Sequence, residues 1–317
     1  MSDFSITEAA FSGVKLLGRR TLAAIVWSAI YMGVFTTLVV VFGGSIINFI
    51  SMVAQHGGKP DPAVVLGLIG SLGGFYLLLV ISSIVLNGVI VCAIYRAEIY
   101  PDDSRFFYLR FGASEGWLML VSFVRGILMF IAQMVMSIPI AIISIAGAAA
   151  SVASAGHTGD MTGASGVFPL ISLVLRLPMY ATLIWLYLRF SLAGPMTFVD
   201  RKFRLFESWT LTQGRVWNLF GVGLLVVLMG VAVYIVIGIV GFSGGFAIWG
   251  SVPHPASAND FFSQQPGQMM QFLAPFLEWA VLLLFVGGIV MLPIAVAPWA
   301  YVYRRMRPET DVAKVFE

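Results

Sequence analysis

Residues 216–248 read VWNLFGVGLLVVLMGVAVYIVIGIVGFSGGFAI and contain no charged side chain. A helix rises about 1.5 Å per residue, so about 20 apolar residues cross the roughly 30 Å of hydrocarbon in a bilayer. This stretch is longer than that minimum and carries no residue that water must solvate. It predicts a transmembrane helix.

Five more apolar runs lie between segments rich in Gly, Pro and charged residues. The sequence therefore predicts an all-α polytopic bundle with six spans, preceded by residues 1–20 and followed by the tail 304–317. Splitting a long run would give seven or eight spans, but the extra loops would lie in hydrocarbon, where their backbone groups lack partners. The predicted spans are 21–50, 63–94, 117–148, 167–194, 216–248 and 272–303.

The composition supports this class. Hydrophobic residues make up 59% of the chain and charged residues 10%, against about 45–50% and about 25% in soluble proteins. Cys92 is the only cysteine, which excludes an intrachain disulfide and a multi-cysteine metal site. A nucleic-acid partner is not expected, because the chain has no basic stripe free of long apolar runs. We predict no cofactor and no metal.

Lysine and arginine alternate along the predicted loops. They occur in the N-terminal segment, the second and fourth loops and the tail, whereas the first loop has only Lys59 and the third and fifth have none. The positive-inside rule then places both termini in the cytoplasm. Five cations of the inner loops are expected to meet anionic lipid headgroups: Arg105, Arg110, Arg201, Lys202 and Arg204.

Residues 4–20 have the pattern of a short amphipathic helix at the membrane surface. Ser5 and Glu8 have capping-box spacing, and Phe4, Phe11 and neighbouring apolar residues give one apolar side. The alternative is an ordinary lead-in that packs on the bundle.

The second and fourth loops resemble each other. RFFYLR at 105–110 and RLFESW at 204–209 each lead through a tryptophan into a span. Mixtures of arginine and aromatic residues suit the headgroup region. The likeness indicates either a parallel repeat of helix pairs or convergence of two interfacial loops on one composition.

The stretch 204–212, followed by Gly214 and Trp217, resembles a motif of bacterial six-helix membrane proteins in the glycerophosphodiester phosphodiesterase membrane-domain-like group. Residues 107–110 and the charged lead-in before Trp27 are similar to that group as well. The resemblance implies a helical domain of the bacterial inner membrane. It does not imply phosphodiesterase chemistry, because the catalytic domain of such enzymes is a separate soluble unit.

Charged groups inside hydrocarbon are costly and are functional candidates. Arg125, Arg176 and Glu278 fall inside predicted spans, at depths of about 12, 14 and 9 Å from the nearer surface. One hypothesis is a polar cavity in which Arg176 pairs with Glu278, the arginines attract an anion, and Asn87, Gln133 and Tyr180 add hydrogen bonds. In the alternative, Arg176–Glu278 is a structural ion pair and Arg125 extends to the inner interface.

The sequence contains no catalytic signature such as HExxH, GxSxG or a Walker loop. We therefore expect a protein without enzymatic activity that handles, transports or senses an anionic or amphiphilic small molecule such as a lipid. The alternative is a structural or assembly partner of another membrane protein, and a homo-oligomer fits either role.

Overall fold

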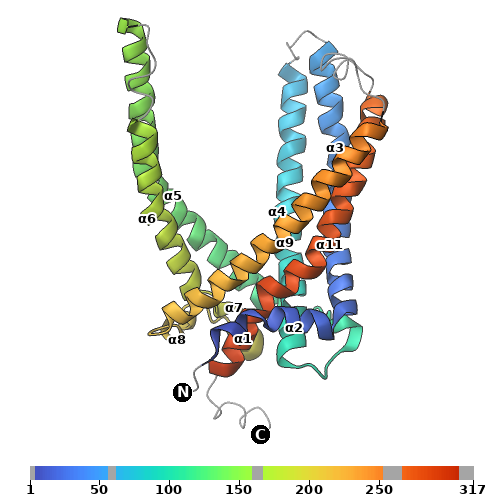
Figure 1. Ribbon diagram of the computed structural model, residues 1–317, viewed down its shortest axis with the longest axis vertical. Helices are drawn as coiled ribbons and strands as arrows, with labels where there is room; N and C mark the ends of the chain where they lie inside the picture. The colour runs from blue at the N-terminus through green and yellow to red at the C-terminus, as the bar shows by residue number, and fades with distance from the viewer. Residues whose placement is uncertain (1–3, 56–61, 159–166, 253–265, 307–317) are drawn as a thin grey trace. The chain divides into compact units, whose positions relative to one another are not determined.

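The computed structural model of the chain describes residues 4–55, 62–158, 167–252 and 266–306 (Figure 1). These residues form helices and no strand, and six helices are long and apolar enough to cross a membrane. The prediction of an all-α, six-span chain is confirmed. The six are α3 (Thr21–Gln55), α4 (Pro62–Ile99), α5 (Ala113–Thr158), α6 (Val167–Arg189), α9 (Val216–Ser251) and α11 (Pro266–Met306).

Two helix ends differ from the sequence prediction. α5 continues through 151–158, where a loop was expected, because the alanine-rich composition favours a helix more than its glycines and serines oppose it. α6 ends at Arg189, within the predicted span 167–194, and a turn separates it from α7 (Ala193–Asp200). Pro195 lies in the first turn of α7, where a missing backbone N–H costs little.

The chain divides into two compact units. The first contains Met1–Glu115 and Val222–Glu317, and the second contains Gly116–Gly221. α5 and α9 each contribute residues to both units.

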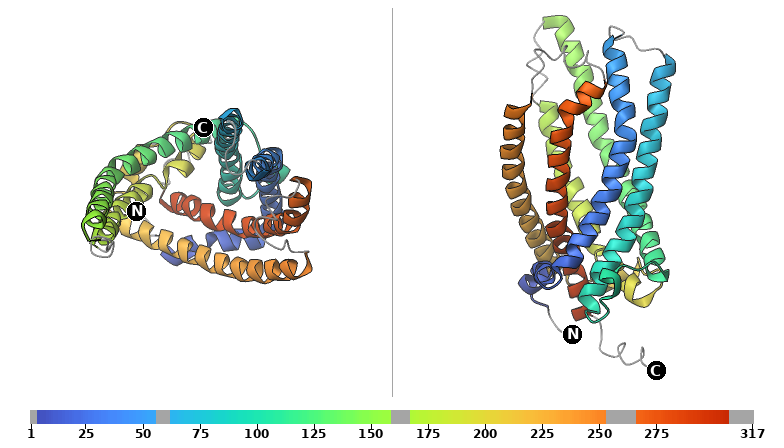
Figure 2. Two further views of the ribbon diagram at one scale, coloured as in Figure 1. Left: turned by 90° about the horizontal axis from the view of Figure 1, so that it is seen from above. Right: turned by 90° about the vertical axis from the view of Figure 1, so that its right-hand side faces the viewer.

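In the first unit, α11 packs against α2 (Ser12–Arg19), α3 and α4, and α3 runs beside α4 (Figure 2). The short helices α1 (Ile6–Ala10) and α2 lie crosswise at one end of the long helices. The Tyr301 hydroxyl and Glu8 Oε2 are 2.9 Å apart, so the end of α11 meets the start of the chain. The predicted amphipathic segment is therefore helical and packs on the bundle, with a break at Phe11.

The buried side chains of this unit gather at that same end. Trp27 of α3 is fully buried among residues of α2, α4 and α11, and its Nε1 donates to the Phe107 carbonyl oxygen at 2.9 Å. Farther along the long helices most large apolar side chains are exposed, as lipid-facing side chains are. The buried core of the unit therefore lies at the end where α1 and α2 lie.

α9 and α11 pack closely against each other at two glycines of α9. A Cβ added at Gly244 would lie 2.4 Å from the Trp279 ring, and Trp279 Nε1 donates to the Gly241 carbonyl oxygen at 3.3 Å. The two glycines thus let one large ring pack directly on the backbone of the neighbouring helix, as small residues do in membrane helix packing.

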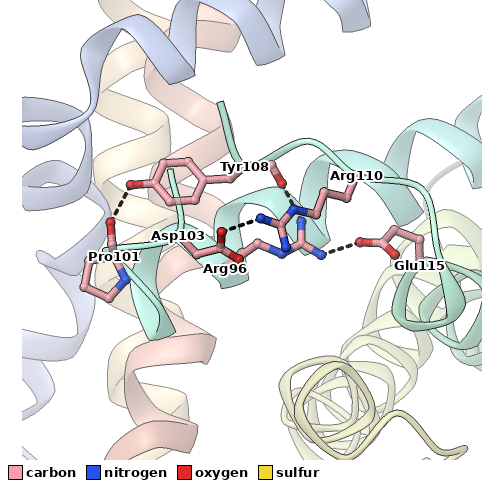
Figure 3. Close-up of polar contacts among 6 residues, drawn as sticks. All are labelled: Arg96, Pro101, Asp103, Tyr108, Arg110 and Glu115. Atoms are coloured by element: carbon pink, nitrogen blue, oxygen red, sulfur yellow. Dashed lines mark hydrogen bonds and ion pairs between the residues drawn. The ribbon is translucent and has the colours of Figure 1, made fainter. Parts of the chain in front are cut away.

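The connection from α4 to α5 is held by a buried ion pair (Figure 3). Arg96 Nη2 lies 2.6 Å from Glu115 Oε1, and Arg96 Nη1 donates to the Tyr108 carbonyl oxygen. The short helix η1 (Arg105–Tyr108) lies between Arg96 and Glu115 in the sequence. Its residues 106–108 are not glycines, yet they have φ of 50°, 56° and 67°. Each left-handed residue costs about 1–2 kcal/mol, so we infer that Arg96 and Glu115 hold this turn closed.

In the second unit, the start of α5 packs against the end of α6. Val121, Phe190, Ala193 and Leu205 form its buried cluster. The short helix α8 (Glu207–Leu211) joins this cluster through Trp209, whose ring lies edge-on to that of Trp185 at 5.1 Å. This packing brings the end of α6 close to α8.

Candidate functional site

The residues singled out from the sequence lie in both units. Arg125 of α5 is half-buried, with its guanidinium 5.9 Å from the centre of the Tyr187 ring of α6. Arg176 of α6 is exposed and belongs to the second unit, whereas Glu278 of α11 is exposed and belongs to the first. Because the two residues lie in different units, the Arg176–Glu278 pair stays a prediction.

The supporting polar residues are divided between the units: Asn87 belongs to the first, and Gln133 and Tyr180 belong to the second. Asn87 donates to the Ser83 carbonyl oxygen of its own helix at 2.8 Å. Gln133 is exposed on α5. Tyr180 is exposed on α6 but lines a groove of the second unit. The predicted hydrogen bonds from these three residues to an anion stay a prediction.

This groove lies between α6 and the start of α9 and has a volume of about 770 Å³. Its α6 side repeats at helical spacing from Leu177 through Tyr180, Ile184 and Trp185 to Leu188. Its α9 side includes Trp217 and Phe220, whose rings meet edge-on with centres 6.0 Å apart. The groove is therefore largely apolar, and its volume lies in the range of small-molecule sites.

Among the described residues that line the groove, Arg189 is the only charged one. Its guanidinium contacts two neighbouring indole rings and lies 5.4 Å from the centre of Trp185 and 5.2 Å from that of Trp209. Such cation–π contacts orient an arginine without neutralising it. These contacts hold the side chain of Arg189, which is the last residue of α6.

The hydrogen bonds of Arg189 leave its charge uncompensated. Nη1 donates to the Trp209 carbonyl oxygen at 3.4 Å and to Thr212 Oγ1 at 3.5 Å, both long for such bonds. Within the described ranges, its Nε is buried without a hydrogen-bond partner and Arg189 forms no ion pair. Arg189 as a whole is half-buried, and a cation partly withdrawn from water normally has a carboxylate partner. The groove therefore presents a positive charge that an anion could satisfy.

The local sequence explains this placement. α6 stops at Arg189, and the Ser208 hydroxyl of α8 donates to the Arg189 carbonyl oxygen at 2.7 Å. That bond satisfies one of the carbonyl groups left open at a helix end. Ser208 and Trp209 of one short helix therefore fix the backbone and the side chain of Arg189 together.

Sequence reasoning passed over Arg189, although it is a charged residue within the predicted span 167–194. Depth alone favoured Arg176, which lies nearer the midplane. One sequence signal was missed: Arg189 lies four residues after Trp185. Side chains at i and i+4 share one face of a helix, so this spacing predicts contact between the two. The contribution of Trp209, from another helix, has no sequence signal.

The cations predicted to meet lipid headgroups fall into two groups. Arg105, Arg201 and Lys202 are exposed. Arg110 is paired with Asp103, and Arg204 Nε lies 3.0 Å from Asp200 Oδ2. Their contact with lipid stays a prediction.

These features define a class of protein: a helical, multi-pass chain with six helices able to cross a membrane and an apolar groove ending at an arginine. Within the described ranges, no three His, Cys, Asp or Glu residues lie together as metal ligands would. Comparisons of the chain with models of known families, with curated proteins and with solved structures gave no match.

Proposed function

We propose that the chain binds an anionic amphiphile that it takes from the membrane. The apolar part of the amphiphile would lie in the groove between α6 and α9, and its anionic head would lie beside Arg189. The observation that supports this proposal is the uncompensated cation at the end of an apolar groove. Handling of such a molecule needs no catalytic group.

Head charge, rather than chain length, should decide which amphiphile binds. Lipid tails are as apolar as leucine, so an acyl chain gains little by leaving the bilayer for an apolar groove. An anion beside Arg189, by contrast, forms charge-assisted hydrogen bonds, which are about twice as strong as neutral ones. We therefore expect fatty acids or anionic lipids to bind more tightly than neutral lipids.

The alternative, a structural partner that docks another membrane protein, predicts apolar faces without a cavity. The groove favours the first role. We also propose that the chain lies in a bacterial inner membrane with both termini in the cytoplasm. The lysine and arginine alternation and the resemblance to the phosphodiesterase membrane-domain-like group support that placement.

A brominated fatty acid tests the groove, because bromine quenches tryptophan fluorescence at short range. The chain would be placed in phosphatidylcholine nanodiscs and titrated with dibromostearate or with its uncharged methyl ester. We expect saturable quenching by the acid and about tenfold weaker binding of the ester, since one lost charged contact corresponds to about 1.4 kcal/mol.

The control is an arginine in the same unit that does not line the groove. Arg189→Gln should remove the preference for the acid, whereas Arg125→Gln should keep it, because Arg125 contacts Tyr187 and not the groove. Equal quenching of the unsubstituted chain by acid and ester would contradict the proposal.

A further inference from the structure

A second hollow, of about 550 Å³, lies within the first unit among α2, the end of α4 and the end of α11. Unlike the groove, it is lined mainly by polar side chains. Its cations come from two parts of the chain that are far apart in sequence: Lys15, Arg19, Arg20, Arg304 and Arg305. We refer to this hollow as the basic pocket.

Among the described residues that line it, the basic pocket has more cations than carboxylates. Glu8 and Glu98 are the two acidic residues in its lining, against five basic ones, which leaves a net charge of +3. Glu8 is bonded to the Tyr301 hydroxyl, and Glu98 Oε1 lies 3.6 Å from Arg304 Nη2. Among residues that the structure describes, Lys15 and Arg19 form no ion pair.

Several of these cations are already held in place. Arg20 Nη2 donates to the Pro101 carbonyl oxygen at 3.0 Å, and its guanidinium lies over the Tyr108 ring. Arg304 Nη1 donates to the Glu98 carbonyl oxygen at 2.9 Å. Arg304 and Arg305 both lie over the Tyr301 ring, at 5.6 and 5.5 Å from its centre. A ligand would therefore meet a site that is largely formed in advance, which lowers the entropy lost on binding.

The sequence of α2 explains why this helix lines one side of the basic pocket. Ser12, Lys15 and Arg19 recur at helical spacing on one side of the helix. On another side, Gly13 rests on α11, where an added Cβ would lie 2.5 Å from the Pro293 carbonyl oxygen. This contact holds the cationic side of α2 close to Arg304 and Arg305.

We infer that the basic pocket binds a phosphate group that carries at least two negative charges. Guanidinium groups match phosphate oxygens in pairs, and the excess charge favours a multiply charged anion over a single carboxylate. The volume lies within the range of about 300–1,000 Å³ seen for small-molecule sites. The phosphate can come from a lipid headgroup or from a soluble compound. The inference goes beyond the proposed amphiphile groove and uses none of its residues.

Thermal unfolding of the full chain in a neutral detergent, at constant ionic strength, tests the inference with two phosphate probes. Inorganic pyrophosphate represents the soluble source, dioctanoyl phosphatidic acid represents the lipid source, and dioctanoyl phosphatidylcholine is the reference lipid. A ligand that binds only the folded state raises the unfolding midpoint in a concentration-dependent way. We expect at least one anionic probe to raise it and the reference lipid to leave it unchanged.

Two variants with the same loss of charge locate the binding. Lys15→Gln/Arg19→Gln removes two exposed cations of the pocket, so its midpoint without ligand should stay near that of the unsubstituted chain. It should need about tenfold more probe for the same rise, a factor that equals about 1.4 kcal/mol. Arg105→Gln/Lys202→Gln, at exposed positions outside the pocket, should respond as the unsubstituted chain does. No rise with either anionic probe, or equal losses in both variants, would overturn the inference.

Discussion

Replacing Arg96 with methionine should destabilise the folded chain by about 3–5 kcal/mol, because it leaves a buried carboxylate without its partner. Arg96 is 7% exposed and Glu115 is 1% exposed, so water cannot replace the lost contact. The substitution also removes the donor to the Tyr108 carbonyl oxygen at the end of the left-handed turn. Denaturant unfolding followed by circular dichroism in detergent would measure the loss.

The control for Arg96→Met is another arginine of the same connection. Arg110 pairs with Asp103, but both side chains are about 40% exposed, and exposed pairs contribute about 0–1 kcal/mol. Arg110→Met should therefore lower the unfolding free energy by less than about 1 kcal/mol. Equal losses for the two variants would show that burial of the Arg96–Glu115 pair has no energetic role.

Gly13→Ala should displace α2 from α11. The added Cβ would lie within 2.8 Å of three backbone atoms of Pro293 and Ile294, which cannot move as a flexible side chain can. Overpacking of this kind costs about 1–3 kcal/mol. We expect faster hydrogen exchange of the α2 amides, measured by mass spectrometry, because the helix would be less often docked.

The same helix provides the matched control. Gly18 has no atom within 4 Å of the position of an added Cβ. Gly18→Ala should slow exchange or leave it unchanged, since alanine is favoured over glycine in a helix by about 0.5–1 kcal/mol. If Gly13→Ala left exchange in α2 as slow as Gly18→Ala does, the close contact with Pro293 would not support docking.

The six spans could be predicted because bilayer thickness sets both the length and the composition of a membrane helix. Helix ends were less predictable. The segment 4–20 is broken at Phe11, where α1 ends, and α6 stops at Arg189 inside a run that stays apolar. Neither break follows from hydropathy, because both depend on packing against other helices.

The sites were less predictable than the spans, because each combines residues far apart in sequence. Arg96 follows the predicted span 63–94 and so belongs to the second predicted loop, where it is one of the cations that indicate orientation, yet it is buried against Glu115. That pairing needs a left-handed turn at Phe106-Phe107-Tyr108, and none of these residue types favours one. The basic pocket combines residues of α2, near the start of the sequence, with residues at the end of α11, near the end of the sequence.

We propose six crossings with the cations on the inner side, and this topology would bring both the basic pocket and the Arg189 end of the groove into contact with the cytoplasm. Single cysteines in a Cys92→Ala chain, labelled in intact cells with a membrane-impermeant maleimide, test it most directly. Lys59→Cys and His157→Cys should be labelled, whereas Lys15→Cys and Lys202→Cys should be labelled only after the membrane is permeabilised. Labelling of Lys202→Cys in intact cells would contradict the account.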